Sequence, residues 1–439
     1  MQRGLNSEQR DNLSLLSPQS SVLSRPKGAR VAINKQTVRD IPPADLKGKR
    51  ALVRVDFNVP VNVGVVGDTT RITAAIPTIR FLLDAGAVVV LISHLGRPKG
   101  KVDPTFSLEP VVPVLAEHLG RPVQFVPACV EEEAEAAVRA AKPGDVLLLE
   151  NLRFHSEEEA NDSGFAAQLA KLGDLYVNDA FGAAHRAHAS TEGVAYLLPA
   201  YAGLLMEKEL NALGGLLAGA KRPFIVVLGG AKISDKIGVI EHLMSKVDGF
   251  CIGGGMANTF LLAQNYGVGT SLVEQEAVAT AHDILARTST RRVGLHVPTD
   301  AIVSTQSAKE LLGVHALEPV TRTVLIDEVR PDDAIYDIGP MTAKYYSSVV
   351  KGARTVLWNG PMGMFEVPAF AHGTITLARA VADASAKGTV SVVGGGDSVA
   401  AIEEAGVADK ITHVSTGGGA SLEFLEGKTL PGVAALKEK

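Results

Sequence analysis

Short, continuous apolar runs alternate with helix-length segments along most of the chain. Runs of this kind are typical of strands buried on both faces of a parallel sheet, and segments such as Arg71–Ala85 and Phe165–Leu172 are predicted helices. The pattern predicts an α/β fold of two doubly wound parallel-sheet (Rossmann-like) domains. The predicted strands are Ala51–Val55, Ala87–Ser93, Val123–Val126, Val146–Leu149, Leu175–Val177, Phe224–Leu228, Gly249–Ile252, Val293–Val297, Thr355–Trp358, Val390–Val393 and His413–Ser415.

The strands fall into two groups separated by Met206–Leu213, which has helical periodicity and is predicted to be a hinge helix. We therefore expect an N-terminal domain over 34–203 and a C-terminal domain over 204–425. Residues 1–33 are rich in serine and arginine and lack a periodic apolar pattern. Glu8 and Asp11 argue against a transit peptide, and no apolar core of a secretory signal is present. We expect a disordered extension there, or an over-extended translation start.

Composition excludes several classes of protein. The chain has 439 residues, of which 46% are hydrophobic and 21% charged, as is usual for globular proteins. Its formal net charge of -5 gives no support for a nucleic-acid partner. No apolar run approaches the length of a membrane span, so no membrane partner is expected. The two cysteines, Cys129 and Cys251, lie far apart, which fits a reducing compartment and a cytoplasmic protein.

Cationic and polar side chains follow the predicted strands of the first half. Because the carboxyl ends of parallel strands share one edge of a sheet, these residues are expected to lie together and bind a small anionic substrate. Singly, each arginine is better explained as a surface ion pair and each histidine as a structural hydrogen-bonding group. The residues are Asp56, Asn58, Arg71, His94, Gly96, Arg97, Arg153, His185, Arg186 and His188.

Glycines follow the predicted strands of the second half, at Gly229-Gly230, Gly253–Gly255, Gly394–Gly396 and Gly417–Gly419. They allow backbone to approach a nucleotide closely, although neither GxGxxG nor a P-loop is present. A helix starting after Gly230 would place Lys232 and Lys236 on one face and favour bound phosphate. The alternative is a glycine turn followed by a solvated charged helix. Asp397 is either a ligand of phosphate-bound Mg²⁺ or a helix N-cap.

Taken together, these motifs resemble the phosphoglycerate kinase family, over about Thr37 to Leu436. In the first half the matching motifs are Arg54–Pro60, Ser93–Pro98, Glu150–Phe154, Asn178–Gly182 and His185–His188. In the second half they are Gly229–Lys236, Gly253–Met256, Trp358–Glu366, Gly394–Ser398 and Ser415–Ser421. Two features differ from the usual family pattern. One is the extension before Val31, and the other is Ile335-Tyr336-Asp337, where the family often has Gly-Leu-Asp near the adenine pocket.

The resemblance implies reversible phosphoryl transfer between 1,3-bisphosphoglycerate and MgADP, giving 3-phosphoglycerate and MgATP. It implies an N-terminal phosphoglycerate-binding domain, onto which the tail 426–439 packs, and a C-terminal nucleotide-binding domain. The implied substrate-binding residues are Asp56, Phe57, Asn58, Arg71, His94, Leu95, Gly96, Arg97, Arg153 and Arg186. The implied nucleotide-binding residues are Gly230, Ala231, Lys232, Lys236, Gly254, Asn359, Pro361, Glu366, Gly395, Gly396, Asp397 and Ser398, with Asp397 also binding Mg²⁺. The implied catalytic residues are Arg71, Lys232, Lys236, Gly395 and Gly418.

The chemistry agrees with this reading, because phosphoryl transfer needs positioning and cations more than covalent help from the protein. We expect a monomer whose partners are its small-molecule substrates, with ATP or ADP as co-substrate and Mg²⁺ as cofactor. Two other functions stay open on the sequence alone: another ATP-dependent kinase for a small carboxylate or amine, and a catalytically silent nucleotide-binding homologue.

Overall fold

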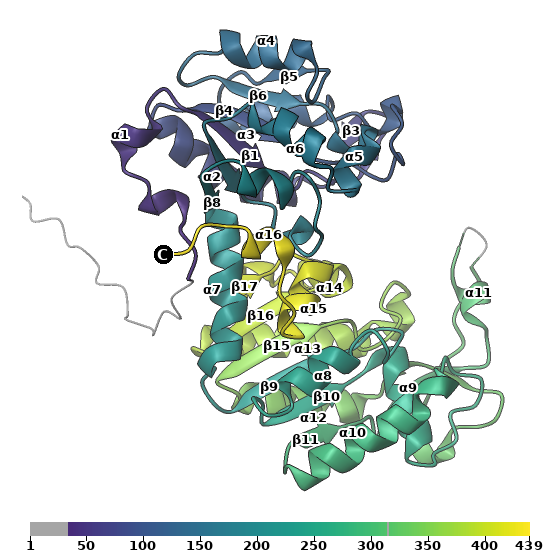
Figure 1. Ribbon diagram of the computed structural model, residues 1–439. Coiled ribbons are helices and arrows are strands. Elements are labelled where there is room, and N and C mark those ends of the chain that lie inside the picture. Colours follow the sequence, from purple (N-terminus) through teal and green to yellow (C-terminus); the bar gives the residue numbers. More distant parts are fainter. Residues whose placement is uncertain (1–33, 314–315) are drawn as a thin grey trace, which may run out of the picture. The chain divides into compact units, whose positions relative to one another are not determined.

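The computed structural model of the chain describes residues 34–313 and 316–439 (Figure 1). The extension expected over residues 1–33 lies outside the described part. Within that part, two six-stranded parallel sheets form the framework, and the predicted α/β fold class of two doubly wound sheets is confirmed.

The first sheet has the strand order β5-β6-β4-β1-β7-β8, and all its strands run parallel. Its central strands are fully buried, which explains their unbroken apolar sequence. After β1 the chain builds the sheet on one side, and it then returns to the other side at β7. Ligands bind at such reversal points in doubly wound sheets. The strands are β1 (Arg50–Arg54), β4 (Val88–Ile92), β5 (Gln124–Val126), β6 (Val146–Leu149), β7 (Leu175–Asn178) and β8 (Ala200–Ala202).

The second sheet has the order β11-β10-β9-β15-β16-β17 and is also wholly parallel. Counted along the chain this is 3-2-1-4-5-6, the order of dinucleotide-binding sheets, with its reversal between β9 and β15. Gly229 and Asn359 lie at that reversal, where the Gly229 amide donates to the Asn359 carbonyl at 3.0 Å. The strands are β9 (Phe224–Leu228), β10 (Gly249–Ile252), β11 (Gly294–His296), β15 (Thr355–Asn359), β16 (Val390–Gly394) and β17 (His413–Val414).

Several strands were not predicted. A separate antiparallel sheet of order β13-β12-β14 stands beside the second sheet, and a short hairpin joins β2 to β3. Strand β13 alternates in burial and β14 is buried only in part, so neither is a continuous apolar run. The additional strands are β12 (Asp300–Ser304), β13 (Arg322–Leu325), β14 (Ala334–Ile338), β2 (Val61–Asn62), β3 (Val65–Val66) and the edge strand β8.

The connecting segments are mostly helical, and the three helices predicted by range lie within a few residues of α2, α6 and α7. Helix α7, predicted as a hinge, directly follows β8 of the first sheet and leads into β9 of the second (Figure 1). The helices are α1 (Pro43–Leu46), α2 (Thr70–Asp84), α3 (Val111–Leu119), α4 (Glu132–Ala140), α5 (Ser156–Glu159), α6 (Ser163–Ala170), α7 (Leu204–Gly219), α8 (Ile237–Leu243), α9 (Gly254–Ala263), α10 (Val278–Thr290), α11 (Ala308–Leu311), α12 (Pro340–Gly352), α13 (His372–Ala386), α14 (Gly396–Glu404), α15 (Gly419–Leu425) and α16 (Pro431–Ala434).

The expectation that Lys232 and Lys236 share one face of a helix was wrong. Helix α8 begins at Ile237, so Lys232 lies in the preceding loop and Lys236 is the N-cap residue. The loop is fixed by the fully buried Ile233 side chain and by Glu274, which accepts from the Ser234 hydroxyl at 2.6 Å. These two contacts give the segment a non-helical path.

The C-terminal segment returns to the first sheet (Figure 1). The Lys437 amide donates to the Ala200 carbonyl of β8 at 3.0 Å, and the Asn178 side chain donates to the Gly432 carbonyl at 3.1 Å. The Gln36 amide donates to the Lys437 carbonyl at 2.7 Å, so a segment near the start of the described chain also binds this tail.

A buried carboxylate organises the start of α7. Asp179, which follows β7, accepts from the Leu205 amide at 2.9 Å and the Met206 amide at 3.2 Å, both through Oδ1. Its Oδ2 has no hydrogen-bond partner among the residues that the structure describes. Burial raises the pKa of Asp179 to about 6, although hydrogen bonding by Thr78 and the two amides opposes the shift.

This arrangement predicts a pH dependence of stability that Asp179→Asn removes. Between pH 4 and pH 6 the folded state keeps the Asp179 proton, whereas the unfolded state has lost it. Stability of the wild type relative to the variant therefore falls as pH rises through this window, by up to about 3 kcal/mol. Asparagine keeps the acceptor Oδ1 and carries no charge, so the variant should lack this contribution. Denaturant unfolding from pH 4 to pH 7 measures the difference.

Asp300 provides a matched control, because it accepts from the Met341 and Thr342 amides of α12 through both of its oxygens. Asp300→Asn must lose one of these bonds and should be destabilising by about 1–3 kcal/mol. If the free energy of unfolding of Asp179→Asn changes with pH in parallel with that of the wild type, the prediction is contradicted.

Candidate active site

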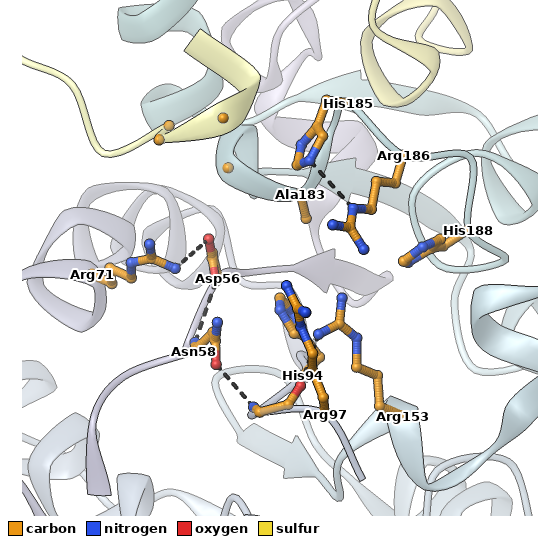
Figure 2. A pocket seen from close by; sticks show the side chains of 15 residues that line it. Asp56, Asn58, Arg71, His94, Arg97, Arg153, Ala183, His185, Arg186 and His188 are labelled. Carbon is orange, nitrogen blue, oxygen red and sulfur yellow. Dashed lines mark hydrogen bonds and ion pairs between the residues drawn. The ribbon is translucent and has the colours of Figure 1, made fainter. Parts of the chain in front are cut away.

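The strand ends of the first sheet open into a basic cleft, shown in Figure 2. The substrate residues expected to line it do so, except Phe57 and Leu95. The turn between β17 and α15 also contributes, although it comes from the second half of the chain. The lining residues are Asp56, Asn58, Arg71, His94, Gly96, Arg97, Arg153, Gly182, Ala183, His185, Arg186, His188, Gly417, Gly418 and Gly419.

Two polar side chains after β1 position other parts of the cleft. Asp56 Oδ2 accepts from Arg71 Nη1 at 2.9 Å and so orients a guanidinium near the start of α2 (Figure 2). Asn58 Oδ1 accepts from the Gly96 amide at 2.9 Å, which fixes the loop after β4. The Asp56 and Asn58 side chains therefore organise the cationic and backbone groups around the cleft.

The other arginines converge on the same space. Arg153 and Arg186 point toward one another across the cleft in Figure 2. Arg153 is 9% exposed, donates to the Gly96 carbonyl at 2.8 Å and lies 3.3 Å from Glu159. Burial lowers the pKa of Arg153, and the nearby Arg54 and Arg186 charges lower it further. The Glu159 carboxylate opposes this shift. Converging cations repel one another, so the cleft favours an anion with several charges.

The histidines of the cleft are held neutral. Burial, followed by the charges of Arg54 and Arg153, keeps the pKa of His94 well below its ordinary value. The same causes lower the pKa of His188 to about 4. A neutral imidazole donates one hydrogen bond without adding to the repulsion among the arginines.

A second cavity lies at the reversal point of the second sheet. Most of the predicted nucleotide-binding residues line it. In this cavity Lys236 donates to Asn359 Oδ1, and the side-chain Nδ2 of Asn359 donates to the Gly394 carbonyl at 2.7 Å. Burial lowers the pKa of Lys236, while Asp235, Asp397 and Glu426 oppose the shift. The lining residues are Gly229, Gly230, Ala231, Lys232, Asp235, Lys236, Asn359, Gly360, Gly395, Gly396, Asp397, Ser398, Gly418, Gly419 and Leu422.

Two glycines of this cavity cannot carry a side chain. A Cβ at Gly229 would lie 1.9 Å from the Pro361 carbonyl oxygen, because two loops cross there in backbone contact. Gly395 has φ +95°, and a Cβ would lie 2.8 Å from the Asn359 amide nitrogen. The nine-residue helix α14 follows Gly395, so its first amides face the cavity and favour an anion.

Asp397 lies in the first turn of α14 but does not cap the helix. The N-cap residue is Gly395, and no side chain caps this end. The alternative reading of Asp397 as an N-cap is therefore wrong. Its exposed carboxylate lines the cavity beside the two lysines. Among the described residues no group of three or more His, Cys, Asp or Glu could hold a metal, and a single carboxylate suits Mg²⁺ that is shared with phosphates.

The turn Gly417–Gly419 connects the two cavities, because Gly418 and Gly419 line both. Its position depends on Glu209 of α7, a fully buried carboxylate. Glu209 accepts from His413 Nε2 at 2.8 Å, Ser415 Oγ at 2.8 Å and the Thr416 amide at 2.7 Å. Burial alone would raise the pKa of Glu209, but these bonds outweigh it and lower the pKa.

Some predicted site residues lie elsewhere. The Phe57 and Leu95 side chains are packed in the core, and their amides already donate to Ser93 and Asn151. Pro361 and the exposed Glu366 line neither cavity. Gly254 lines a third, small cavity with Asn258, Pro298, Met362 and Ile335–Ile338, which includes the segment that differs from the family pattern.

Sequence reasoning also missed Arg54, which lines neither cavity. It is the last residue of β1, is fully buried, and its Nη2 lies 3.0 Å from His94 Nδ1. The one available signal was a charged residue at the end of an otherwise apolar strand.

A basic cleft and a glycine-rich, lysine-bearing cavity that share one turn define a phosphotransferase with an anionic substrate. The chain belongs to the phosphoglycerate kinase family, whose family model matches residues 38–428. The chain is therefore an ATP-binding transferase with the phosphoglycerate kinase activity of its family, which belongs to glycolysis.

Similar proteins cover nearly the whole chain. Phosphoglycerate kinase of Moorella thermoacetica is 57% identical over 405 residues, which are 92% of this chain and all of that protein. The Chloroflexus aurantiacus enzyme is 56% identical over 409 residues, with the same coverage. The Coxiella burnetii structure superposes with a TM-score of 0.81 at 38% identity, covering 91% of this chain and 98% of that one. The Pyrococcus horikoshii structure superposes with a TM-score of 0.78 at 33% identity, with the same coverage of both chains. In the described residues, none of the helices is both long and apolar enough to cross a membrane.

The cavity geometry predicts that Lys236 acts mainly in the transition state. Its ammonium is buried and its flexible stem can leave Asn359 to follow a moving phosphoryl group. Lys236→Ala should lower kcat by roughly 10²–10³, as loss of one preorganised charge contact does, while KM for ATP changes much less. Lys236→Arg should also be impaired, because a planar fork does not replace a compact ammonium. Steady-state kinetics measures both effects.

Lys232→Ala is the matched control, since Lys232 belongs to the same loop but is exposed. It should raise KM for ATP more than it lowers kcat. A raised KM with normal kcat in Lys236→Ala would make Lys236 a simple nucleotide anchor instead.

Proposed function

We propose that the basic cleft binds the phosphoglycerate and the glycine-rich cavity binds the nucleotide, with transfer occurring at the turn between them. The observation that carries this proposal is that Gly418 and Gly419 line both cavities. A phosphoryl group leaving one cavity toward the other must pass this turn. The decisive assay couples 3-phosphoglycerate and MgATP to detection of ADP. An inactive chain that still binds ATP would indicate a silent homologue.

In the basic cleft, Arg71, Arg97, Arg153 and Arg186 bind the charges of the substrate, and neutral His94 donates to it. Guanidinium groups suit this role because their planar fork matches carboxylate and phosphate oxygens. Asp56 orients Arg71, and Asn58 orients the Gly96 loop. The substrate carboxylate is already ionised at neutral pH and can attack directly, so no catalytic base is needed.

In the glycine-rich cavity, the loops at Gly230–Lys232 and Gly395–Ser398 surround the nucleotide phosphates. The amides at the start of α14 and the Ser398 hydroxyl donate to phosphate oxygens. Lys232 binds the nucleotide phosphates, and Lys236 neutralises charge that spreads over the transferring group, which is the main requirement of phosphoryl transfer. Because the two ligands occupy different domains, hinge bending at α7 would bring them into line and exclude water.

Asp397 is the residue that would hold Mg²⁺, since it presents the carboxylate that fits a metal shared with phosphates. When bound, Mg²⁺ would supply positive charge to the nucleotide phosphates. We further propose that the enzyme works as a monomer, because the chain itself provides both cavities. Gel filtration at assay concentration measures that state. We also propose that it is cytoplasmic, because Cys129 and Cys251 are buried free thiols, which fits a reducing compartment.

We predict that Arg71→Ala weakens 3-phosphoglycerate binding by at least tenfold, because it removes a charge-assisted contact and leaves Asp56 unpaired. Arg80→Ala is the control, since Arg80 lies in the same helix but donates to the His118 carbonyl. Titration calorimetry of the full chain compares the two variants. Equal affinity in both would exclude Arg71 from the substrate site.

We predict that Asp397→Asn raises the Mg²⁺ concentration needed for half-maximal activity, because an amide is a weaker ligand for a hard cation than a carboxylate. Helix α14 should be unaffected, since Asp397 does not cap it. Activity measured across a Mg²⁺ series at saturating ATP gives the result. A variant with unchanged Mg²⁺ dependence would exclude Asp397 as the metal ligand.

A further inference from the structure

Arg54 lies behind the basic cleft and does not line it. It is the last residue of β1, is 1% exposed, and contacts three groups that surround its guanidinium. Its Nε donates to Ser190 Oγ at 2.8 Å, its Nη1 donates to the Val55 carbonyl, and its Nη2 lies 3.0 Å from His94 Nδ1. None of these partners is a carboxylate, so the charge is not neutralised by direct contact.

A balancing charge, Glu158, is connected to Arg54 through Ser190. Ser190 Oγ accepts from Arg54 and donates to Glu158 Oε1 at 2.6 Å, and the Ser190 amide donates to Glu158 Oε2 at 2.9 Å. Glu158 is fully buried, and burial raises its pKa although Arg54 and Ser190 oppose the shift. A continuous series of hydrogen bonds therefore runs from Glu158 through Ser190 and Arg54 to His94.

The series ends at one nitrogen of His94, and this fixes where the imidazole carries its proton. A guanidinium has five donors and no acceptor, so His94 Nδ1 must accept. The ring is neutral and has a single proton, which must therefore lie on Nε2. No described residue forms a hydrogen bond with Nε2, and His94 lines the cleft.

We propose that Arg54 is a positioning residue for the reaction, which sets the His94 tautomer so that Nε2–H is presented to the anionic substrate. The proposal rests on the proposed function in so far as His94 contacts that substrate. With Nδ1–H instead, His94 would turn an unprotonated nitrogen with its lone pair toward an anion, and the contact would become repulsive. The buried guanidinium of Arg54 thus orients one neutral donor, His94 Nε2–H, toward the cleft.

The first test needs no substitution. In the full chain with ¹⁵N-labelled histidine, long-range ¹H–¹⁵N spectra at neutral pH without substrate distinguish the two tautomers. His94→Gln assigns the signals. We expect Nε2 protonated and Nδ1 unprotonated. A proton on Nδ1, or a doubly protonated ring, would overturn the proposal whatever happens to any variant.

The second test uses Arg54→Met, which keeps bulk and removes the donors. The expected result is a mixed tautomer signal for His94 and an increase of about tenfold in KM for 3-phosphoglycerate, as loss of an oriented hydrogen bond produces. KM for ATP should not change. Arg50→Met is the matched control, because Arg50 begins the same strand but pairs with Asp174 at 2.7 Å, away from the cleft. It should change neither the signal nor KM.

The proposal is overturned if the His94 spectrum of Arg54→Met is identical to that of the wild type. It is also overturned if the spectrum changes but KM for 3-phosphoglycerate does not, provided that His94→Gln does raise that KM. If His94→Gln binds 3-phosphoglycerate as the wild type does, the assignment of His94 in the proposed function fails. The spectrum alone then decides whether Arg54 sets the tautomer. Circular dichroism identifies a variant that does not fold, and Arg54→Leu, which also has no donor, then replaces Arg54→Met.

Discussion

The arrangement of the active site depends on one buried carboxylate, Glu209 of α7. A buried charge is stable only when hydrogen bonds replace its lost hydration, and Glu209 obtains them from the segment 413–416. These bonds join the helix between the two sheets to the strand that leads into Gly417–Gly419. Because that turn lines both cavities, a rotation of α7 would move the surface that the two cavities share. The same carboxylate therefore serves both the packing of α7 and the position of the turn.

Much of the framework could be predicted from the sequence, because strands of parallel sheets are buried on both faces and appear as continuous apolar runs. Strands such as Val146–Leu149 and Phe224–Leu228 were predicted to the residue. The antiparallel strands β13 and β14 escaped prediction because part of their surface faces outward. Strand β12 is fully buried, but it begins with Asp300 and ends with Ser304, which leaves an apolar run of only three residues. The start of α8 was misplaced because burial of Ile233 and the bond to Glu274 override the local helical pattern.

The candidate site was predictable where function requires a side chain directly after a strand. His94 and Arg153 follow that rule, whereas Arg71 lies in the first turn of α2, and the fold collects all three at one edge. Phe57 and Leu95 share the motifs but point into the core, which a motif alone cannot show. Arg54 was missed for the opposite reason, because its influence passes through His94 and only coordinates show which atom of the imidazole it reaches. Sequence patterns locate residues, whereas proton positions and hydrogen-bond direction require the fold.

The tail that binds β8 has a consequence for synthesis of the chain. Asn34 and Glu438 are 404 residues apart, yet their side chains are hydrogen-bonded, and Lys437 pairs with Ala200 of the first sheet. A ribosome produces the first domain long before the segment that completes its edge. That domain must wait with unpaired backbone until translation reaches residues 432–438. A chain cut short before this segment lacks the Lys437 partner of the Ala200 carbonyl. An incompletely paired sheet edge is the kind of surface that chaperones and proteases recognise.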